Sequence, residues 1–144
     1  MWFEDLKEGQ AFTSDSVVIT QEMIDCFSKA AGDKNPLHLD PEYAAKRRPF
    51  RGIIAHGELV AAIMSALGAE IIGYECIHSQ VKTETGWPRP TRPGDSVFAL
   101  MRVKEILKER GRSGNICFEV LLKNHLLENV AKGTRELVIL KKPR

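Results

Sequence analysis

The sequence has few cysteines and little net charge, and each shortage excludes a class of protein. Cys26, Cys76 and Cys117 lie far apart and include no CxxC pair. A zinc or thiol-exchange site built on such a pair is therefore excluded, and a reduced, cytoplasmic location is expected. The formal net charge is only +2. Because there is also no long basic run or interleaved aromatic platform, we expect no nucleic acid partner.

Long hydrophobic runs are also missing. The longest apolar stretch, residues 59–72, is too short to span a bilayer and is interrupted by Ser65 and Glu70. The amino terminus carries Glu4 and Asp5 where a secretory signal would carry positive charge. We therefore expect neither a membrane partner nor a secretory signal.

What is present is ordinary globular composition, with 43% hydrophobic and 28% charged residues in 144. This length fits a single domain, residues 1–144, that can bury a real core. The pattern predicts a first strand at residues 11–19. A helix follows, with Thr20 as its cap, apolar residues at helical spacing and Gly32 at its end.

A long helix is predicted at residues 57–71, with a broad apolar surface that indicates burial on most sides. A second stripe of small residues along it would let a substrate approach: Gly57, Ala61, Ser65 and Gly68. After Gly73 the period changes to two, which predicts strands at about residues 76–87, 97–103, 116–122 and 137–140. The order of elements favours an α+β fold with a long central helix packed on one antiparallel sheet.

Residues 32–58 carry the densest set of chemical groups. Asp33 and His38 lie five residues apart across Pro36, which biases Asn35 away from helical geometry. We therefore predict a non-helical loop, on which a carboxylate and an imidazole converge on one water or substrate proton. From spacing alone, a turn with a purely structural Asp and His remains the alternative.

The start of the long helix is the second candidate. Backbone N–H groups point outward at a helix start and can stabilise a developing oxyanion. Gly57 has no side chain, so an acyl carbonyl can reach its N–H. Taken alone, His56 is more typical of a partly buried polar residue, and Ser65 of a small packing residue.

The remaining candidate groups have plainer interpretations than catalysis. Asp40 followed by proline is typical of a helix cap. The basic residues 46–51 form a solvated connector or contact the phosphates of a carrier group. No HxH or HxxxH spacing arranges the histidines for a metal, so none is expected. Cys26 and Cys117 are predicted to pack in the core.

Residues 32–40, followed by Tyr43-Ala44, Phe50 and residues 54–57, closely resemble the hydratase motif of the MaoC-like, (R)-specific enoyl-CoA hydratases. Residues 90–95 resemble a second element of that family. The resemblance implies a hot dog fold, in which a curled antiparallel sheet wraps a long central helix, usually as a homodimer. It also implies reversible addition of water to a trans-2-enoyl-CoA, giving an (R)-3-hydroxyacyl-CoA, with the CoA thioester as substrate and no cofactor.

Carried over by position, the resemblance implies four catalytic residues. Asp33 and His38 would hold and activate the water, and the N–H of Gly57 would stabilise the thioester enolate oxygen. Ser65 matches a serine of the central helix that supports the site. Asn35 would orient the loop and contact substrate.

His56, Glu58 and Arg51 complete the substrate-binding candidates. Glu58 departs from the family, which commonly has an apolar residue there, and either faces solvent or selects against long aliphatic chains. Two alternative functions remain open. One is a hot dog acyl-CoA thioesterase with Glu58 or Glu70 as its carboxylate, and the other is a non-catalytic module that binds acyl-CoA or an acyl carrier.

Overall fold

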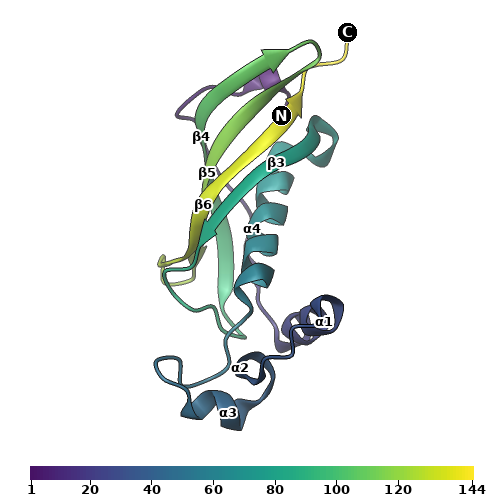
Figure 1. The fold of residues 1–144 in the computed structure, drawn as a ribbon. Helices are drawn as coiled ribbons and strands as arrows, with labels where there is room; N and C mark the ends of the chain where they lie inside the picture. The colour runs from purple at the N-terminus through teal and green to yellow at the C-terminus, as the bar shows by residue number, and fades with distance from the viewer.

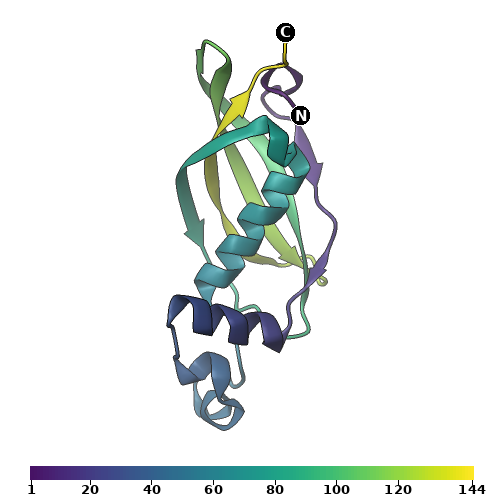
Figure 2. The same cartoon turned by 90° about the vertical axis from the view of Figure 1, so that its right-hand side faces the viewer.

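The computed structural model describes residues 1–144 as a curled antiparallel sheet wrapped around one long helix (Figure 1, Figure 2). The strand order is β1-β4-β5-β6-β3, with β2 pairing on β4. The strands are β1 (Ala11–Thr13), β2 (Val17–Val18), β3 (Ile77–Gly86), β4 (Ser96–Arg110), β5 (Ser113–Asn124) and β6 (Asn129–Leu140). This confirms the predicted α+β class and the order of its elements.

The helices gather around one end of the long helix α4. They are α1 (Gln21–Ala31), α2 (Pro36–Leu39) and α3 (Pro41–Lys46), and α4 itself spans Gly57–Ile72. The short 3₁₀ turn η1 (Phe3–Asp5) lies near the amino terminus, and η2 (Tyr74–Cys76) follows the other end of α4. Both figures place α1, α2 and α3 beyond the amino-terminal end of α4, away from the two chain termini. No helix is both long and apolar enough to cross a membrane.

The core lies between α4 and the concave face of the sheet. Alternate residues of β4 and β5 point inward, including the fully buried Phe118. They meet Val60 and Met64 of α4 in one cluster of 23 buried residues. Burying a side chain of this size contributes about 1.5–3 kcal/mol. The sheet and α4 therefore form the rigid base from which the smaller helices project.

One face of α4 is more open than the sequence predicts. Glu58, Ala62, Ala66 and Glu70 recur at every fourth position and are all exposed. The sheet covers the helix from the other side, so the expectation of burial on most sides is only partly correct. The stripe of small residues lies nearer the sheet, because a side chain at Gly68 would contact Met101.

Side-chain caps set the helix boundaries as predicted. The Thr20 hydroxyl accepts a hydrogen bond from Met23 N–H at 3.1 Å, and Gly32 ends α1 with φ of 78°. The Asp40 carboxylate accepts from the N–H groups of Glu42 and Tyr43 at the start of α3. Because α1 ends at Gly32, Asp33 is the first residue beyond the helix cap.

The segment between these helices differs from the prediction. Asn35 is extended, with ψ of 122°, as the following proline requires. However, residues 36–39 form the helical turn α2, so the expectation of a wholly non-helical loop was wrong. Pro36 occupies the first helical position, where no N–H is needed, and the Asn35 side chain caps the turn by accepting from Leu37 N–H at 3.0 Å.

Two other predictions require correction. The strand expected at residues 11–19 is split, because the Ser14 hydroxyl accepts the N–H of Ala99 at 2.8 Å in place of a strand carbonyl. The expected core packing of Cys26 and Cys117 was also wrong. Cys26 is exposed, two positions along the helix from buried Ile24, and Cys117 is half-buried on the outer face of β5.

Candidate active site

Three ionisable side chains from separate elements meet beside the start of α4. Asp33 follows α1, His38 lies on α2, and His56 immediately precedes α4. One ligand-type atom from each side chain lies within 4.8 Å of the others. A single water can bridge two polar groups at this separation. The predicted convergence of Asp33 and His38 is therefore present in the fold.

The environment of His38 sets which ring nitrogen carries its proton. The side chain is only 8% exposed, and its Nδ1 lies 2.7 Å from the Ile54 carbonyl oxygen. Because a carbonyl can only accept, Nδ1 is the donor and a neutral ring leaves its Nε2 unprotonated. His38 can thus take a proton at Nε2.

Asp33 is held by its backbone, which leaves its carboxylate available. Its carbonyl oxygen accepts hydrogen bonds from the Ser28 hydroxyl and from Nε2 of His56, the latter at 3.2 Å. One carboxylate oxygen accepts from Asn35 N–H at 3.1 Å. The side chain is exposed. Its remaining lone pairs can therefore orient a water toward His38.

His56 has a larger place in this cluster than the sequence indicates. It is 2% exposed, and its ring centroid lies 3.9 Å from that of His38 and 4.9 Å from that of Phe27. Burial is the main cause that lowers the pKa of His56, and proximity to His38 lowers it further, against the opposing effect of Asp33. His56 therefore packs against His38, and its burial disfavours the protonated ring.

The cluster bears on the expectation of no metal. That expectation relied on sequence spacing, which did not anticipate that the fold brings Asp33, His38 and His56 together. Nδ1 of His38 and Nε2 of His56 each already face a carbonyl oxygen. Nδ1 of His56 is buried without a hydrogen-bond partner. The absence of a metal remains a prediction, which EDTA treatment would test.

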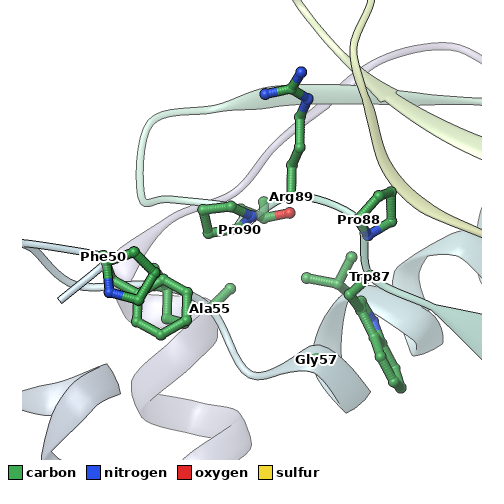
Figure 3. Close-up of a pocket in the computed structure, with 11 residues that line it drawn as sticks. Phe50, Ala55, Gly57, Trp87, Pro88, Arg89 and Pro90 are labelled. Atoms are coloured by element: carbon green, nitrogen blue, oxygen red, sulfur yellow. The ribbon is translucent and has the colours of Figure 1, made fainter. Parts of the chain in front are cut away.

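The start of α4 adds a backbone donor next to the cluster. No side chain caps this helix, so its first N–H groups, including that of Gly57, are open. A Cβ atom on Gly57 would lie 3.1 Å from the Trp87 ring. Glycine therefore keeps Trp87 close to the helix start, as Figure 3 shows.

A pocket of about 370 Å³ opens at this point. Phe50 and Trp87 stand on two sides of it, and Gly57 lies at its edge (Figure 3). The Arg89 side chain extends away from Gly57 in the same view. Asp33 and His38 do not line the pocket, but Ile54, whose carbonyl holds His38, does. The pocket and the ionisable cluster thus lie next to each other, separated by the segment that leads into α4.

The other predicted residues lie outside the cluster. Ser65 is two helical turns, about 12 Å, along α4 from Gly57, and its hydroxyl accepts from Nε of Arg135 at 2.7 Å. Glu58 and Arg51 are exposed. Asn35 contacts Asp33 through its backbone and caps α2. The cluster therefore combines Asp33, His38 and His56, with Gly57 beside it.

Sequence reasoning missed Arg92. Its guanidinium donates to the carbonyl oxygens of Phe50 and Ile53, and so holds the loop that forms one wall of the pocket. The backbone N–H of Arg92 donates to the Asp95 carboxylate at 2.9 Å. The only sequence signal was its place in residues 90–95, the second element of resemblance.

Comparison with known families identifies the family of this chain. The family model described as "MaoC like domain" matches residues 5–125. The chain belongs to this family. Among relatives, the 3-hydroxybutyryl-CoA dehydratase of Methylorubrum extorquens is 32% identical over 138 residues, which cover 92% of this MaoC-like chain and 85% of that protein.

Solved structures agree on the fold. The R-hydratase PhaJ1 of Pseudomonas aeruginosa superposes with a TM-score of 0.84 at 27% identity, over 98% of this MaoC-like chain and 86% of that one. A Mycobacterium tuberculosis protein described as a double hotdog fold gives a TM-score of 0.85 at 17% identity, over 99% and 45% of the two chains. The hot dog fold implied by the resemblance is thereby confirmed.

Proposed function

We propose that this MaoC-like protein catalyses the reversible hydration of a trans-2-enoyl-CoA to an (R)-3-hydroxyacyl-CoA. The observation that carries the proposal is the approach of Asp33 and His38, whose polar atoms lie within 4.8 Å beside the open start of α4. The dehydratase and R-hydratase names of its relatives support the same reaction.

The proposed hydration starts from a water held between Asp33 and His38. Nε2 of His38 accepts a proton from the water while the Asp33 carboxylate orients it. The water oxygen bonds to C3, and the electrons of the C2–C3 double bond move toward the thioester oxygen, which the Gly57 N–H stabilises. C2 then takes the proton from His38, so the elements of one water are added and no cofactor is consumed.

The CoA thioester is assigned to the pocket beside Gly57. Trp87 and Phe50 offer apolar surface to the chain that precedes the thioester. Arg89 lines this pocket, and the exposed Arg51 follows Phe50, which also lines it. Both carry a positive charge that suits the CoA phosphates. His56 and Asn35 act on the substrate through the placement of Asp33 and His38.

We also propose that the active form is a homodimer. β3 is the last strand in the sheet order, so one edge of it has no neighbour within the chain. Val81 of this strand is 57% exposed, and Ala66 of the open face of α4 is also exposed. A second copy would pair that edge and cover these apolar side chains.

Hydration assays test the proposal directly. We expect loss of the conjugated thioester absorbance of crotonyl-CoA without release of free thiol. We also expect the product to be oxidised by an (R)-specific but not an (S)-specific 3-hydroxyacyl-CoA dehydrogenase. Thiol release without hydration would replace the proposal with thioester hydrolysis, and binding without either reaction would replace it with a binding module.

A further inference from the structure

Arg135 is a buried cation between β6 and α4. Its residue is only 2% exposed. Nε donates to the Ser65 hydroxyl at 2.7 Å, and Nη1 donates to the carbonyl oxygens of Glu84 and Thr134 at 3.1 and 2.9 Å. Nη2 makes one long hydrogen bond, of 3.4 Å, to the Ala61 carbonyl oxygen. A guanidinium has five N–H groups, so at least one on Nη2 is uncommitted.

No carboxylate balances this charge. Every partner of Arg135 is neutral, and it takes part in none of the ion pairs of the protein. Burial alone lowers the pKa of the guanidinium, which still remains protonated at neutral pH. The nearby Glu84 carboxylate pairs instead with Lys82 on the outer face. Buried charges are normally paired, so this environment favours the binding of an anion.

The guanidinium borders a cavity of about 280 Å³. Ser65, Gln80 and Arg135 supply its polar wall, and the rest is formed by small and apolar residues such as Gly68 and Met101. The Ser65 hydroxyl accepts from Arg135, so its own proton is free to be donated into this space. The cavity therefore combines room for an apolar chain with donors for an anionic end.

We propose that this cavity receives the far end of the acyl group and that Arg135, with Ser65, binds a terminal carboxylate there. The substrate class is then a CoA monothioester of an unsaturated dicarboxylic acid. This inference rests on the proposed hydratase function and specifies its substrate. Ser65 becomes a specificity residue in this assignment, rather than a support of the water-activating pair.

The position of the cavity sets the length of that acyl group. Gly57, Ala61 and Ser65 follow one another on the same face of α4, and the Arg135 guanidinium contacts both Ala61 and Ser65. The separation from Gly57 is between one and two helical turns, about 6–12 Å. With bonds of about 1.5 Å, an acyl chain of roughly six to eight carbons spans it.

The test compares the rates at which the unmodified protein hydrates two matched substrates. The pair is trans-2-octenedioyl-CoA and its terminal methyl ester, which differ in charge but hardly in length, with crotonyl-CoA as a reference for hydration itself. We expect kcat/KM to be about ten- to hundredfold higher for the free carboxylate, as for a hydrogen bond to a charged group. Equal values, or a higher value for the ester, overturn the inference.

Variants then assign the preference to Arg135. In Arg135→Met we expect the carboxylate-to-ester ratio to fall to about one, while crotonyl-CoA is still hydrated. Arg135→Lys should retain part of the preference, and Arg102→Met, which removes an exposed arginine of β4, should retain all of it. A preference that survives in Arg135→Met overturns the assignment even if the unmodified protein prefers the carboxylate.

The substrate comparison in the unmodified protein stands even if Arg135→Met fails to fold. If crotonyl-CoA is hydrated but the carboxylate is not preferred, only the substrate assignment fails. If none of the three thioesters is hydrated, the hydratase proposal fails and the substrate assignment fails with it.

Discussion

The imidazole rings of His38 and His56 pack against each other with centroids 3.9 Å apart. Nδ1 of His38 and Nε2 of His56 each face a carbonyl oxygen, so both rings have a defined donor. Two protonated rings at this distance would repel one another. In the proposed mechanism, His38 therefore takes up a proton most readily when His56 is neutral, which makes the activity of the site depend on pH.

Acid should destabilise the protein through His56. Burial lowers the pKa of His56 below its ordinary value of 6.5, so the unfolded chain binds a proton at a higher pH than the folded chain does. Stability is then complete above pH 6.5 and is lost as the pH falls from there toward the folded-state pKa. Urea unfolding between pH 8 and pH 5 measures the loss.

His56→Gln is the comparison for this effect. It removes the titrating ring, so its stability should fall less between pH 8 and pH 5 than that of the unmodified protein, whatever its stability at pH 8. An identical decline in the two proteins would show that His56 does not carry the effect.

Gly57→Ala should lower activity more than stability. The added methyl would lie 3.1–3.4 Å from the Trp87 ring, and Trp87 is 43% exposed and able to shift. We expect a small change in melting temperature, but about a ten- to hundredfold loss of kcat/KM, because the N–H donor and the pocket wall move together. If the contact is the cause, Gly57→Ala should lower kcat/KM less in a Trp87→Ala background than in the unmodified protein.

Much of the fold was predictable because its signals are local. The boundaries of α1 and α3 follow from Thr20, Gly32 and Asp40, whose caps form as the sequence predicts. The strands after Gly73 follow from alternation, because one face of each strand packs on the core. The turn at α2 was missed since a proline that bars a helix before it can also begin one.

The candidate site was only partly predictable. Asp33, His38 and Gly57 lie in one short stretch, and their residue types indicate their chemistry. The roles of His56 and Arg135 depend on contacts between distant segments: His56 reaches the Asp33 carbonyl, and Arg135 reaches Ser65 across 70 positions. Neither spacing nor periodicity reports which buried polar group meets which, so these roles required the three-dimensional fold.

Removal of metal should leave activity unchanged. Asp33, His38 and His56 could hold an ion by distance, but two of the four ring nitrogens already face carbonyl oxygens, and the proposed steps need only water. Hydration rates before and after EDTA treatment, with Zn²⁺ and Mg²⁺ added back, provide the check. A rate that falls with EDTA and returns with one ion would establish a metal in the reaction.

Glu58→Gln should leave hydration unchanged, and neither this variant nor the unmodified protein should release free thiol. The side chain is exposed on the open face of α4, where surface substitutions usually change stability by no more than about 0.5 kcal/mol. Glu70 on the same face should behave alike. Thiol release by the unmodified protein that is lost in Glu58→Gln would instead identify Glu58 as the carboxylate of a thioesterase.

The most direct measurement is the rate of crotonyl-CoA hydration by Asp33→Asn and His38→Gln. The first removes the carboxylate that orients the water, and the second removes the imidazole that accepts its proton, with little change in side-chain size. Asp15→Asn and His125→Gln make the same changes at exposed positions and serve as controls. We predict a fall in kcat of about 10²–10⁴ in the first two variants and unchanged rates in the controls. Hydration at the unmodified rate by both folded variants would contradict the assignment of Asp33 and His38 as the water-activating pair.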